Sequence, residues 1–515
     1  MKKDDNLSIA TRIFASGILK NLITNILSFV NRTVFICYLG KELLGINSAV
    51  ISIINILSLS ELGIGTSFIF ILYSALKRHD ENEINSIMAY FKKIYSFIGV
   101  FIICIGILII PFLNSFILTS DEMEKYVLPC YIICVFQTSI TYFFSAYKRC
   151  LLMADKKEDK INNILTIWAI GNSAVQLSAI LITKNFIMYL IVGAISNVIQ
   201  NLIIAYVTQK EYTYLNLKNA KAVSSDVKKV LKTSVSSIMV VKIGQAFYKA
   251  SDSIIVSKFL GVAILAMYDN YYMLINIIQQ ILSTLITSFN AIIGNLATDG
   301  NNDDLYSKYK KLEFIAVSLF MTCAVCYVNC VNPFIKWWLA DDYLLDVSFV
   351  IFVASRFWVV GLNQTLMVFK DSMGLFKYGR FLSPLTGISN IILSVILLKF
   401  IGVAGVALAS LVCDLCIYFV AHPKAVIKIG MKKGLQEYYK RYVLYWIMYL
   451  SSLFITKYVI SHILLANSFI QFIFNGIISA ILSITIITIF MRRTEEYKYL
   501  LNICISKIIK LIVKK

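Results

Sequence analysis

Long apolar runs separated by short polar breaks fill most of the chain. A membrane-spanning helix needs about 20 predominantly apolar residues, and most of the runs are near that length. The pattern therefore predicts an all-α protein that crosses a bilayer many times. The fourteen predicted spans are 13–38, 44–72, 94–118, 127–147, 161–183, 186–207, 233–257, 264–297, 313–334, 348–369, 382–399, 404–421, 442–460 and 468–491.

The 49 Lys and Arg residues are distributed unevenly over the polar breaks. If the N-terminus is cytoplasmic, 37 of them fall on the cytoplasmic side, seven fall outside and five lie within spans. Cytoplasmic loops of membrane proteins carry such an excess of Lys and Arg. We therefore expect both termini to be cytoplasmic. This bias accounts for the formal net charge of +20 without a nucleic-acid partner, and none is expected.

The chain is 58% hydrophobic, against about 45–50% in soluble domains, which leaves no room for a large soluble domain. Two CxxC spacings, Cys323–Cys326 and Cys413–Cys416, lie inside predicted spans and lack the loop context of a zinc or redox site. His79, His422 and His462 fall in predicted loops, so no Ser/His/Asp arrangement is available in the membrane. We expect neither a metal site nor a catalytic site.

Several sequence landmarks of the first half of the chain recur in the second half at a nearly constant offset. Pro111-Phe112-Leu113 closes the third span, and Pro333-Phe334-Ile335 closes the ninth. Lys148 after span four and Lys370 after span ten are separated by the same offset as the two prolines. A repeat with an even number of spans gives two lobes of the same orientation, related by an axis along the membrane normal.

The repeat predicts five regions of the chain. The two lobes have six helices each and are followed by two additional spans. The last region is a basic amphipathic segment that should lie on the inner leaflet. The regions are an N-lobe (1–207), a cytoplasmic linker (208–232), a C-lobe (233–421), spans 13 and 14 (422–491) and the cytoplasmic tail (492–515).

Five cations lie within the predicted spans, where a charged side chain costs about 2.5–3.5 kcal/mol. They are Lys20 and Arg32 on span one, Lys242 and Lys249 on span seven, and Arg356 on span ten. Because spans one and seven are equivalent in the repeat, we expect these cations to converge on one cavity suited to an anionic substrate. Arg in particular holds phosphate through its planar donors. The lysines could instead snorkel to an interface, and Arg32 and Lys249 could form an outer gate.

The acids within spans are Glu61, Asp252, Asp269 and Asp414. Glu61 could pair with Arg32 and lock the first two helices, and Asp252 can pair with Lys249 three residues before it. No GxxxxGK[ST] motif is present, so transport would draw on an ion gradient or on the gradient of the substrate itself. Glu61, Asp252 and Asp269 are the candidates for binding H⁺ or Na⁺ as the coupling ion. No other cofactor is expected.

Two motifs carry a family resemblance: YLGxxxLGI at Tyr38 to Ile46 and LSLxELGIGT at Leu57 to Thr66. They resemble bacterial polysaccharide repeat-unit flippases, of the O-antigen or capsular type, in the multidrug/oligosaccharidyl-lipid/polysaccharide exporter superfamily. The resemblance implies two helical bundles in a V around a central cavity. It also implies that undecaprenyl-diphosphate-linked oligosaccharides are flipped to the outer leaflet of the bacterial plasma membrane by alternating access. Membrane lipids and a polysaccharide polymerase would be partners.

Other functions stay open. A lipid II flippase, another lipid-linked glycan flippase or a drug/cation antiporter would belong to the same superfamily. A membrane polymerase or glycosyltransferase would carry its chemistry in a large outer loop. The longest predicted outer segments, about 114–126 and 335–347, are only about a dozen residues each. We therefore expect a transporter and not an enzyme.

Overall fold

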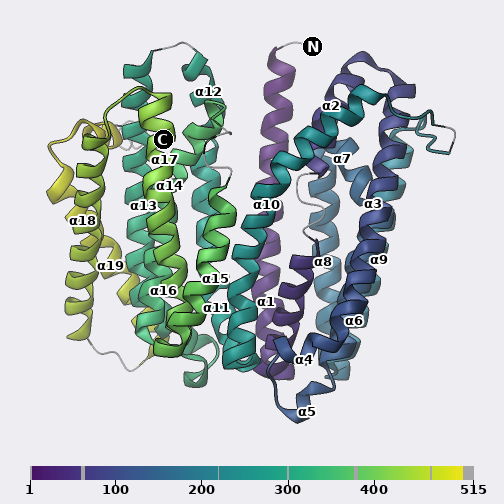
Figure 1. Cartoon of the computed structure of the whole chain (residues 1–515). Coiled ribbons are helices and arrows are strands. Elements are labelled where there is room, and N and C mark those ends of the chain that lie inside the picture. The colour runs from purple at the N-terminus through teal and green to yellow at the C-terminus, as the bar shows by residue number, and fades with distance from the viewer. Residues whose placement is uncertain are drawn as a thin grey trace, which may run out of the picture. The chain divides into compact units, whose positions relative to one another are not determined.

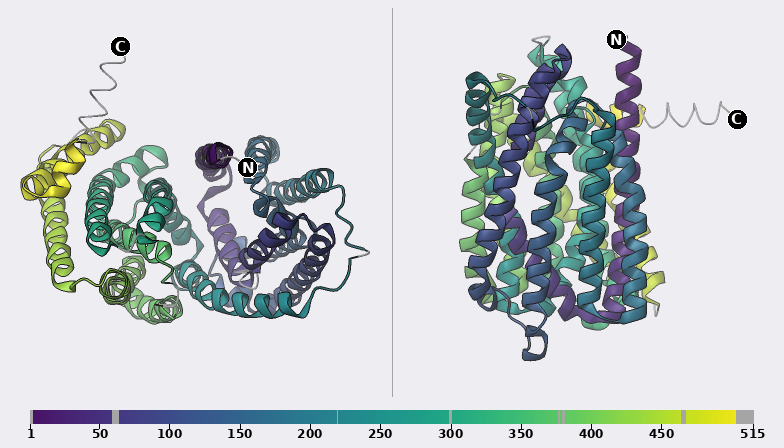
Figure 2. Two further views of the ribbon diagram at one scale, coloured as in Figure 1. Left: turned by 90° about the horizontal axis from the view of Figure 1, so that it is seen from above. Right: turned by 90° about the vertical axis from the view of Figure 1, so that its right-hand side faces the viewer.

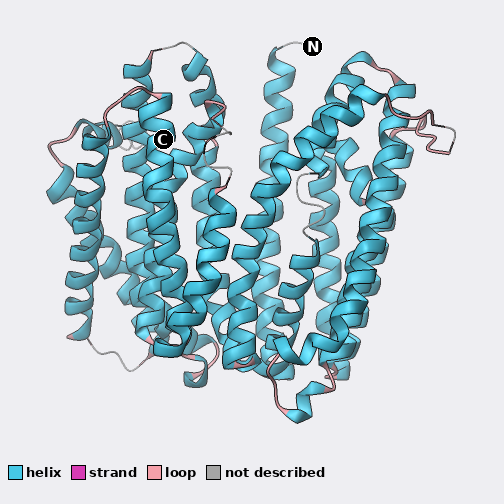
Figure 3. Ribbon diagram, in the orientation of Figure 1, coloured by secondary structure: helices cyan, strands magenta, loops and turns pink. Residues whose placement is uncertain are grey.

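The computed structural model describes residues 3–58, 64–218, 220–298, 301–375, 378, 381–463 and 467–502. Within these ranges all regular structure is helical and no strand occurs (Figure 3). The chain divides into two compact units, Met1–Ala266 and Met267–Lys515. In each unit the long helices run side by side (Figures 1 and 2). The predicted all-α fold is confirmed.

The first unit is built on α1, which contacts α6, α8 and α10. Helix α1 is interrupted at Gly40, where φ is 83° and ψ is 174°. Glycine accepts this conformation because it has no Cβ, so the predicted break between spans one and two is confirmed. The helices of this unit are α1 (Lys3–Leu57), α2 (Ile64–Arg78), α3 (Glu81–Ile109), η2 (Ile110–Phe112), α4 (Leu113–Phe116), α5 (Asp121–Glu124), α6 (Val127–Phe144), α7 (Ala146–Ala154), α8 (Glu158–Thr183), α9 (Phe186–Glu211) and α10 (Ser225–Leu260).

Helix α10 holds the predicted span seven, and it packs on the first unit through contacts with α1, α2 and α4. The repeat had placed this span in the C-lobe. The predicted linker 208–232 is also shorter in the structure, because α9 extends to Glu211 and α10 begins at Ser225. The two compact units are defined by contacts in the structure, whereas the two lobes are inferred from the sequence repeat. The lobes therefore stay a prediction.

The second unit is centred on α13, which contacts α14, α18 and α19. Helix α11 starts in the first unit and continues into the second. The helices are α11 (Val262–Thr287), α12 (Asn290–Thr298), α13 (Asn302–Trp338), η3 (Asp341–Tyr343), α14 (Val347–Ser372), α15 (Leu382–Ile401), α16 (Val403–Cys413), η4 (Asp414–Tyr418), α17 (Phe419–Pro423), η5 (Lys424–Gly430), α18 (Leu435–Ser461) and α19 (Ser468–Met491).

The structure corrects the end of span twelve. A loop was expected from His422 onward, but helical structure continues through α16, η4, α17 and η5 to Gly430. Pro423 lies inside this helix and has no N–H to donate. The flanking segments η4 and η5 are π-helical, and such wider turns accommodate irregularities within a continuing helix. His422 is therefore buried in a helix and does not lie in a loop.

Twelve described helices are long and apolar enough to cross a membrane, so the chain is a multi-pass membrane protein. The first of them, Arg12–Leu57, contains all of predicted span one and only residues 44–57 of predicted span two. Helix α10 is not among the twelve, and Lys242, Lys249 and Asp252 interrupt its apolar run. The predicted number of fourteen spans therefore stays a prediction.

The start of the predicted amphipathic tail packs on the second unit. Residues 495–502 are helical, and the Tyr497 ring lies 6.3 Å from the Phe314 ring of α13. The Lys311 ammonium lies 4.9 Å from the centre of the Tyr499 ring. Residues 503–515 lie outside the described residues, so the inner-leaflet position of the tail stays a prediction.

Candidate functional site

Lys20 lies near the middle of the part of α1 that precedes Gly40, and its side chain is half-buried. Helix α8 contacts this side of α1 through two hydrogen bonds. Asn162 Nδ2 donates to Ser16 Oγ at 3.2 Å, and Ser173 Oγ donates to Asn31 Oδ1 at 2.6 Å. At about 100° per residue, Lys20 is within about 40° of both Ser16 and Asn31 around the helix. Lys20 therefore faces α8, inside the first unit.

Arg32 lies elsewhere on α1 and makes a different contact. Its Nη2 donates to the carbonyl oxygen of Ala266, in the first turns of α11, at 3.3 Å. Twelve residues separate Arg32 from Lys20, which is about 18 Å along the axis and about 120° around it. The structure therefore does not bring these two predicted site residues together; they lie at two depths and on two sides of one helix.

Close packing holds α1 on both sides of its break at Gly40. The Phe35 ring meets the rings of Phe186 and Tyr189 edge-on, at 5.9 and 5.2 Å between centroids. A Cβ at Gly45 would lie 1.9 Å from the carbonyl oxygen of Val262, so α1 and the start of α11 meet backbone to backbone. The segment before Gly40 is therefore held by α9 at Phe35, and the segment after Gly40 is held by α11 at Gly45.

Three predicted site residues cannot be placed. Glu61 and the side chains of Lys242 and Lys249 lie outside the described residues. Asp252 of α10 is 4% exposed, and Asp269 of α11 is partly buried. The convergence of cations from α1 and α10, and the role of the acids in ion coupling, therefore stay predictions.

Arg356, the fifth predicted cation, is held in an ion pair. Its Nε lies 3.0 Å from Oδ2 of Asp414, and the two side chains are 18% and 4% exposed. Asp414 is the first residue of the π-helical segment η4, and Arg356 comes from α14. The sequence singled out both residues, but it did not pair them. An anionic substrate would have to compete with Asp414 for this guanidinium.

A second buried pair was missed by the sequence analysis. Arg441 Nη2 lies 2.7 Å from Glu313 Oε2, and the side chains are 14% and 3% exposed. Tyr309 donates its hydroxyl to the other carboxylate oxygen at 2.5 Å. The pair joins α13 to α18. Both residues lie at the predicted starts of membrane spans, so the only sequence signal for the pair was a charged residue at each of these two boundaries. Its enclosure by protein groups indicates a structural role.

A charged cluster at one end of the first unit holds the loop after α9. Lys157 Nζ lies 2.6 Å from Asp155 and 2.9 Å from Glu211. Tyr212 donates its hydroxyl to Asp155 at 2.8 Å. Burial disfavours the charge on Lys157, but the hydrogen bonds to Asp155 and Glu211 outweigh burial and raise its pKa. Asn85 of α3 adds hydrogen bonds to the backbone of this loop. We assign the cluster a structural role.

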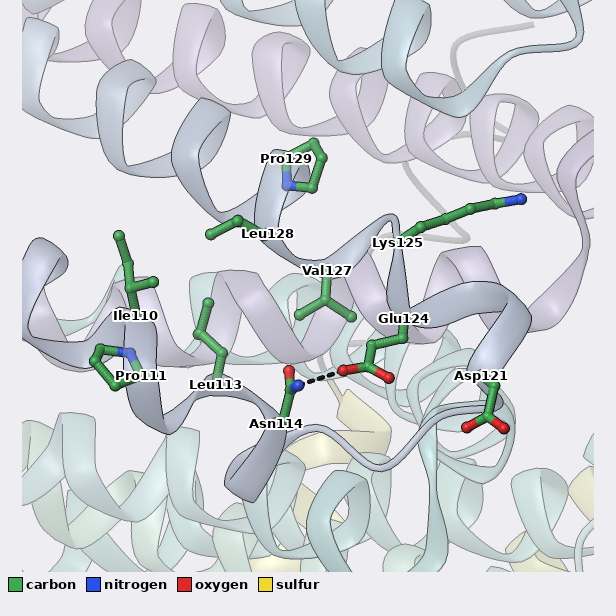
Figure 4. A pocket seen from close by; sticks show the side chains of 10 residues that line it. All are labelled: Ile110, Pro111, Leu113, Asn114, Asp121, Glu124, Lys125, Val127, Leu128 and Pro129. Atoms are coloured by element: carbon green, nitrogen blue, oxygen red, sulfur yellow. Dashed lines mark hydrogen bonds between the residues drawn. The ribbon is translucent and has the colours of Figure 1, made fainter.

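A cavity of about 670 Å³ lies in the hairpin between α3 and α6 (Figure 4). Asp121 and Glu124 line it, and Asn114 donates a hydrogen bond to Glu124. Figure 4 shows the Lys125 side chain directed away from Glu124. Carboxylates on the wall do not suit a phosphate-bearing substrate. This cavity is therefore not the predicted cation-lined site.

Residues 11–289 match a family described as polysaccharide biosynthesis protein. Among solved structures, "Lipid II flippase MurJ, inward closed conformation" matches with a TM-score of 0.69 and 15% identity, over 93% of this chain and 99% of that one. An inward-facing MATE multidrug resistance transporter of the MOP superfamily matches with a TM-score of 0.65 and 13% identity, over 81% and 98%. No curated protein matches the chain.

A third solved structure, a MOP superfamily transporter from Pyrococcus furiosus, matches with a TM-score of 0.57 and 13% identity. The match covers 83% of this chain and 96% of that one. The binding pocket of that transporter is described as having reverse polarity. At such identities these likenesses establish the fold: the helices are arranged as in MOP superfamily transporters.

Proposed function

Because the chain belongs to the polysaccharide biosynthesis protein family, we propose that it moves lipid-linked oligosaccharide repeat units across the bacterial plasma membrane. The substrate would be an undecaprenyl-diphosphate-linked oligosaccharide, which passes from the inner to the outer leaflet by alternating access. The product would serve capsular or other surface polysaccharide synthesis. The family match over residues 11–289 carries this proposal.

The cations of α1 support an anionic substrate. A charged side chain inside a membrane is expensive and usually marks a substrate or ion pathway. Lys20 and Arg32 lie about 18 Å apart along the helix and on two sides of it, so each would hold the diphosphate at its own depth and would have to turn toward the substrate to do so. Lys242 and Lys249 would supply the cations of α10. Arg356 would contribute only when its pair with Asp414 opens.

Energy for transport would come from an H⁺ or Na⁺ gradient or from the substrate gradient. We propose Asp252, Asp269 and Glu61 as the groups that bind the coupling ion. Both termini would lie in the cytoplasm, following the Lys and Arg bias. The protein would act as a transporter without chemical conversion of the glycan. A polysaccharide polymerase would receive the product.

A second candidate is flipping of lipid II or of another lipid-linked glycan. It is favoured by the match to the MurJ structure, which covers 93% of this chain, whereas the match to the inward-facing MATE structure covers 81%. Both candidates share a prenyl diphosphate carrier, so both require cations in the membrane. They differ in the glycan, and paired transport assays with the two lipids separate them.

The role of the cations can be tested by glycan export from cells that depend on this protein. Arg32→Gln and Lys20→Gln should each lower export at least about tenfold at equal membrane abundance, since tenfold corresponds to about 1.4 kcal/mol of lost phosphate interaction. Lys399→Gln, at an exposed position near the end of α15, is the matched control and should export normally. Wild-type export by both α1 variants would contradict substrate binding by these cations.

Arg32→Lys refines the result. If the planar guanidinium holds phosphate by two parallel hydrogen bonds, lysine should substitute poorly. If Arg32 only keeps its surroundings positive, Arg32→Lys should retain most export while Arg32→Gln loses it. Full export by Arg32→Gln would exclude both roles.

A further inference from the structure

Two buried basic side chains lie on neighbouring helices at one end of the second unit. Lys370, near the end of α14, is 8% exposed, and His422, in α17, is 5% exposed. Helices α14 and α17 are in contact, and the Lys370 ammonium acts electrostatically on the His422 imidazole. Both residues lie outside the cation set that the sequence predicted for the substrate.

Neither side chain is satisfied within the described part of the chain. Lys370 makes no hydrogen bond or ion pair there, and Nδ1 of His422 is buried without a hydrogen-bond partner. A buried lysine is almost always paired, because an unpaired charge away from water is expensive. Asp371, the next residue, is exposed and acts electrostatically on the Lys370 ammonium, but it forms no hydrogen bond or ion pair with it.

The surroundings fix both groups in place. The His422 ring stacks on the Tyr418 ring, with 4.7 Å between centroids and 23° between planes. The π-helical segments η4 and η5 flank α17, and such turns occur frequently at functional sites. The backbone N–H of Leu375 donates to the Lys370 carbonyl at 3.0 Å and closes the helix end. Both groups are therefore held in place, and Asp371 is the acidic group that acts on Lys370 from a distance.

The first unit shows what a purely structural lysine looks like at the equivalent place in the repeat. Lys148 occupies the position that matches Lys370, and its ammonium donates to the carbonyl of Ala205 at 3.2 Å. Burial and the neighbouring Lys92 lower the pKa of Lys148. Lys148 thus has a protein acceptor, whereas the structure gives Lys370 none. An acceptor from outside the chain would complete the second site.

The position of the pair suits a lipid headgroup. The end of the second unit that holds Lys370 also carries the ion pair of Lys310 with Glu437, at 3.3 Å. Val420, two residues before His422, is 55% exposed, as expected of a side chain that faces lipid tails. Basic pockets between membrane helices on the cytoplasmic side bind anionic lipid headgroups.

We propose that Lys370 and His422 form a binding site for the phosphate group of a membrane lipid. Lysine attracts phosphate as a point charge, and a neutral imidazole donates one N–H to a phosphate oxygen. Two lipids present this chemistry: an anionic phospholipid, and the prenyl diphosphate of the substrate. Only the second source rests on the proposed function.

Thermal unfolding of the purified full-length protein in detergent, with added lipid, tests the site. The probes are phosphatidylglycerol, undecaprenyl diphosphate, and diacylglycerol as a matched lipid without phosphate. In the wild type, at least one phosphate lipid should raise Tm more than diacylglycerol does. Lys370→Met keeps the apolar stem and removes the unpaired charge, so it should fold and should need at least tenfold more phosphate lipid for half the shift. His422→Asn, a second variant, should also weaken the response.

Lys428→Gln is the matched control, since it removes an exposed lysine from η5 in the same helix and should respond as the wild type does. A lost response to phosphatidylglycerol supports a phospholipid site, whatever the protein transports. A lost response to undecaprenyl diphosphate alone supports the substrate as the source. Wild-type responses of Lys370→Met and His422→Asn to both phosphate lipids would overturn the proposal, as would an equal shift with diacylglycerol.

Discussion

Breaking the Arg356–Asp414 ion pair should destabilise the second unit, and the two single variants should differ. Removing one partner of a buried pair costs about 3–5 kcal/mol, because the remaining charge is uncompensated. Arg356→Met leaves Asp414, whose side chain is only 4% exposed, so we expect the upper part of this range. Asp414→Leu leaves Arg356, which is 18% exposed and keeps some solvation, so we expect the lower part.

The double variant decides whether the ion pair causes these losses. Replacing a buried ion pair by apolar residues of similar volume is often neutral or stabilising. Arg356→Met combined with Asp414→Leu should therefore lie within about 1 kcal/mol of the wild type, with a coupling energy of at least about 5 kcal/mol. Equilibrium unfolding of the purified protein in mixed micelles, followed by circular dichroism, measures all four free energies. Additive single costs would refute the pairing, as would costs below about 0.5 kcal/mol.

Three further predictions concern topology and packing. Lys336→Cys should react with an impermeant maleimide added outside cells, and Lys432→Cys should not, once the labelling of the protein's own cysteines is subtracted. Labelling of Lys432→Cys would contradict cytoplasmic termini. Gly45→Val should destabilise the protein by about 1–3 kcal/mol or more, because its Cβ would lie 1.9 Å from the Val262 carbonyl; an unchanged Tm would show that α1 and α11 can separate. Lys157→Gln should speed amide hydrogen exchange in the loop after α9, since it removes two ion pairs. Unchanged exchange would mean that the hydrogen bonds of Asn85 and Tyr212 hold the loop without Lys157.

The apolar runs predicted the helices well because the length of an apolar run reports directly on a membrane span. The break at Gly40 was predictable for a similar reason: Gly40-Lys41-Glu42 interrupts two apolar runs, and glycine adopts a positive φ without strain. The predicted end of span twelve was wrong because proline normally ends a helix. In this protein π-helical segments on both sides of α17 allow the helix to continue past Pro423.

The site was less predictable, because a sequence pattern gives the face of a helix but not its partner. Arg356 and Asp414 are 58 residues apart, and nothing in either helix specifies the other. Arg32 and Ala266 are 234 residues apart, and the contact uses a backbone carbonyl that has no sequence signal. The angular offset between Lys20 and Arg32 was available from helical periodicity alone, and it already argued against a single cluster on α1.

The most direct test of the proposed function is transport by the purified protein in liposomes. An undecaprenyl-diphosphate-linked oligosaccharide is placed in both leaflets, and an impermeant glycosidase digests the outer pool. An imposed H⁺ or Na⁺ gradient is then varied, and the fraction of glycan that becomes accessible is followed over time. The proposal predicts that wild-type protein and Lys399→Gln expose the inner pool, and that Arg32→Gln does so at least about tenfold more slowly. Transfer no faster than in protein-free liposomes, with every gradient and with the substrate gradient alone, would contradict it.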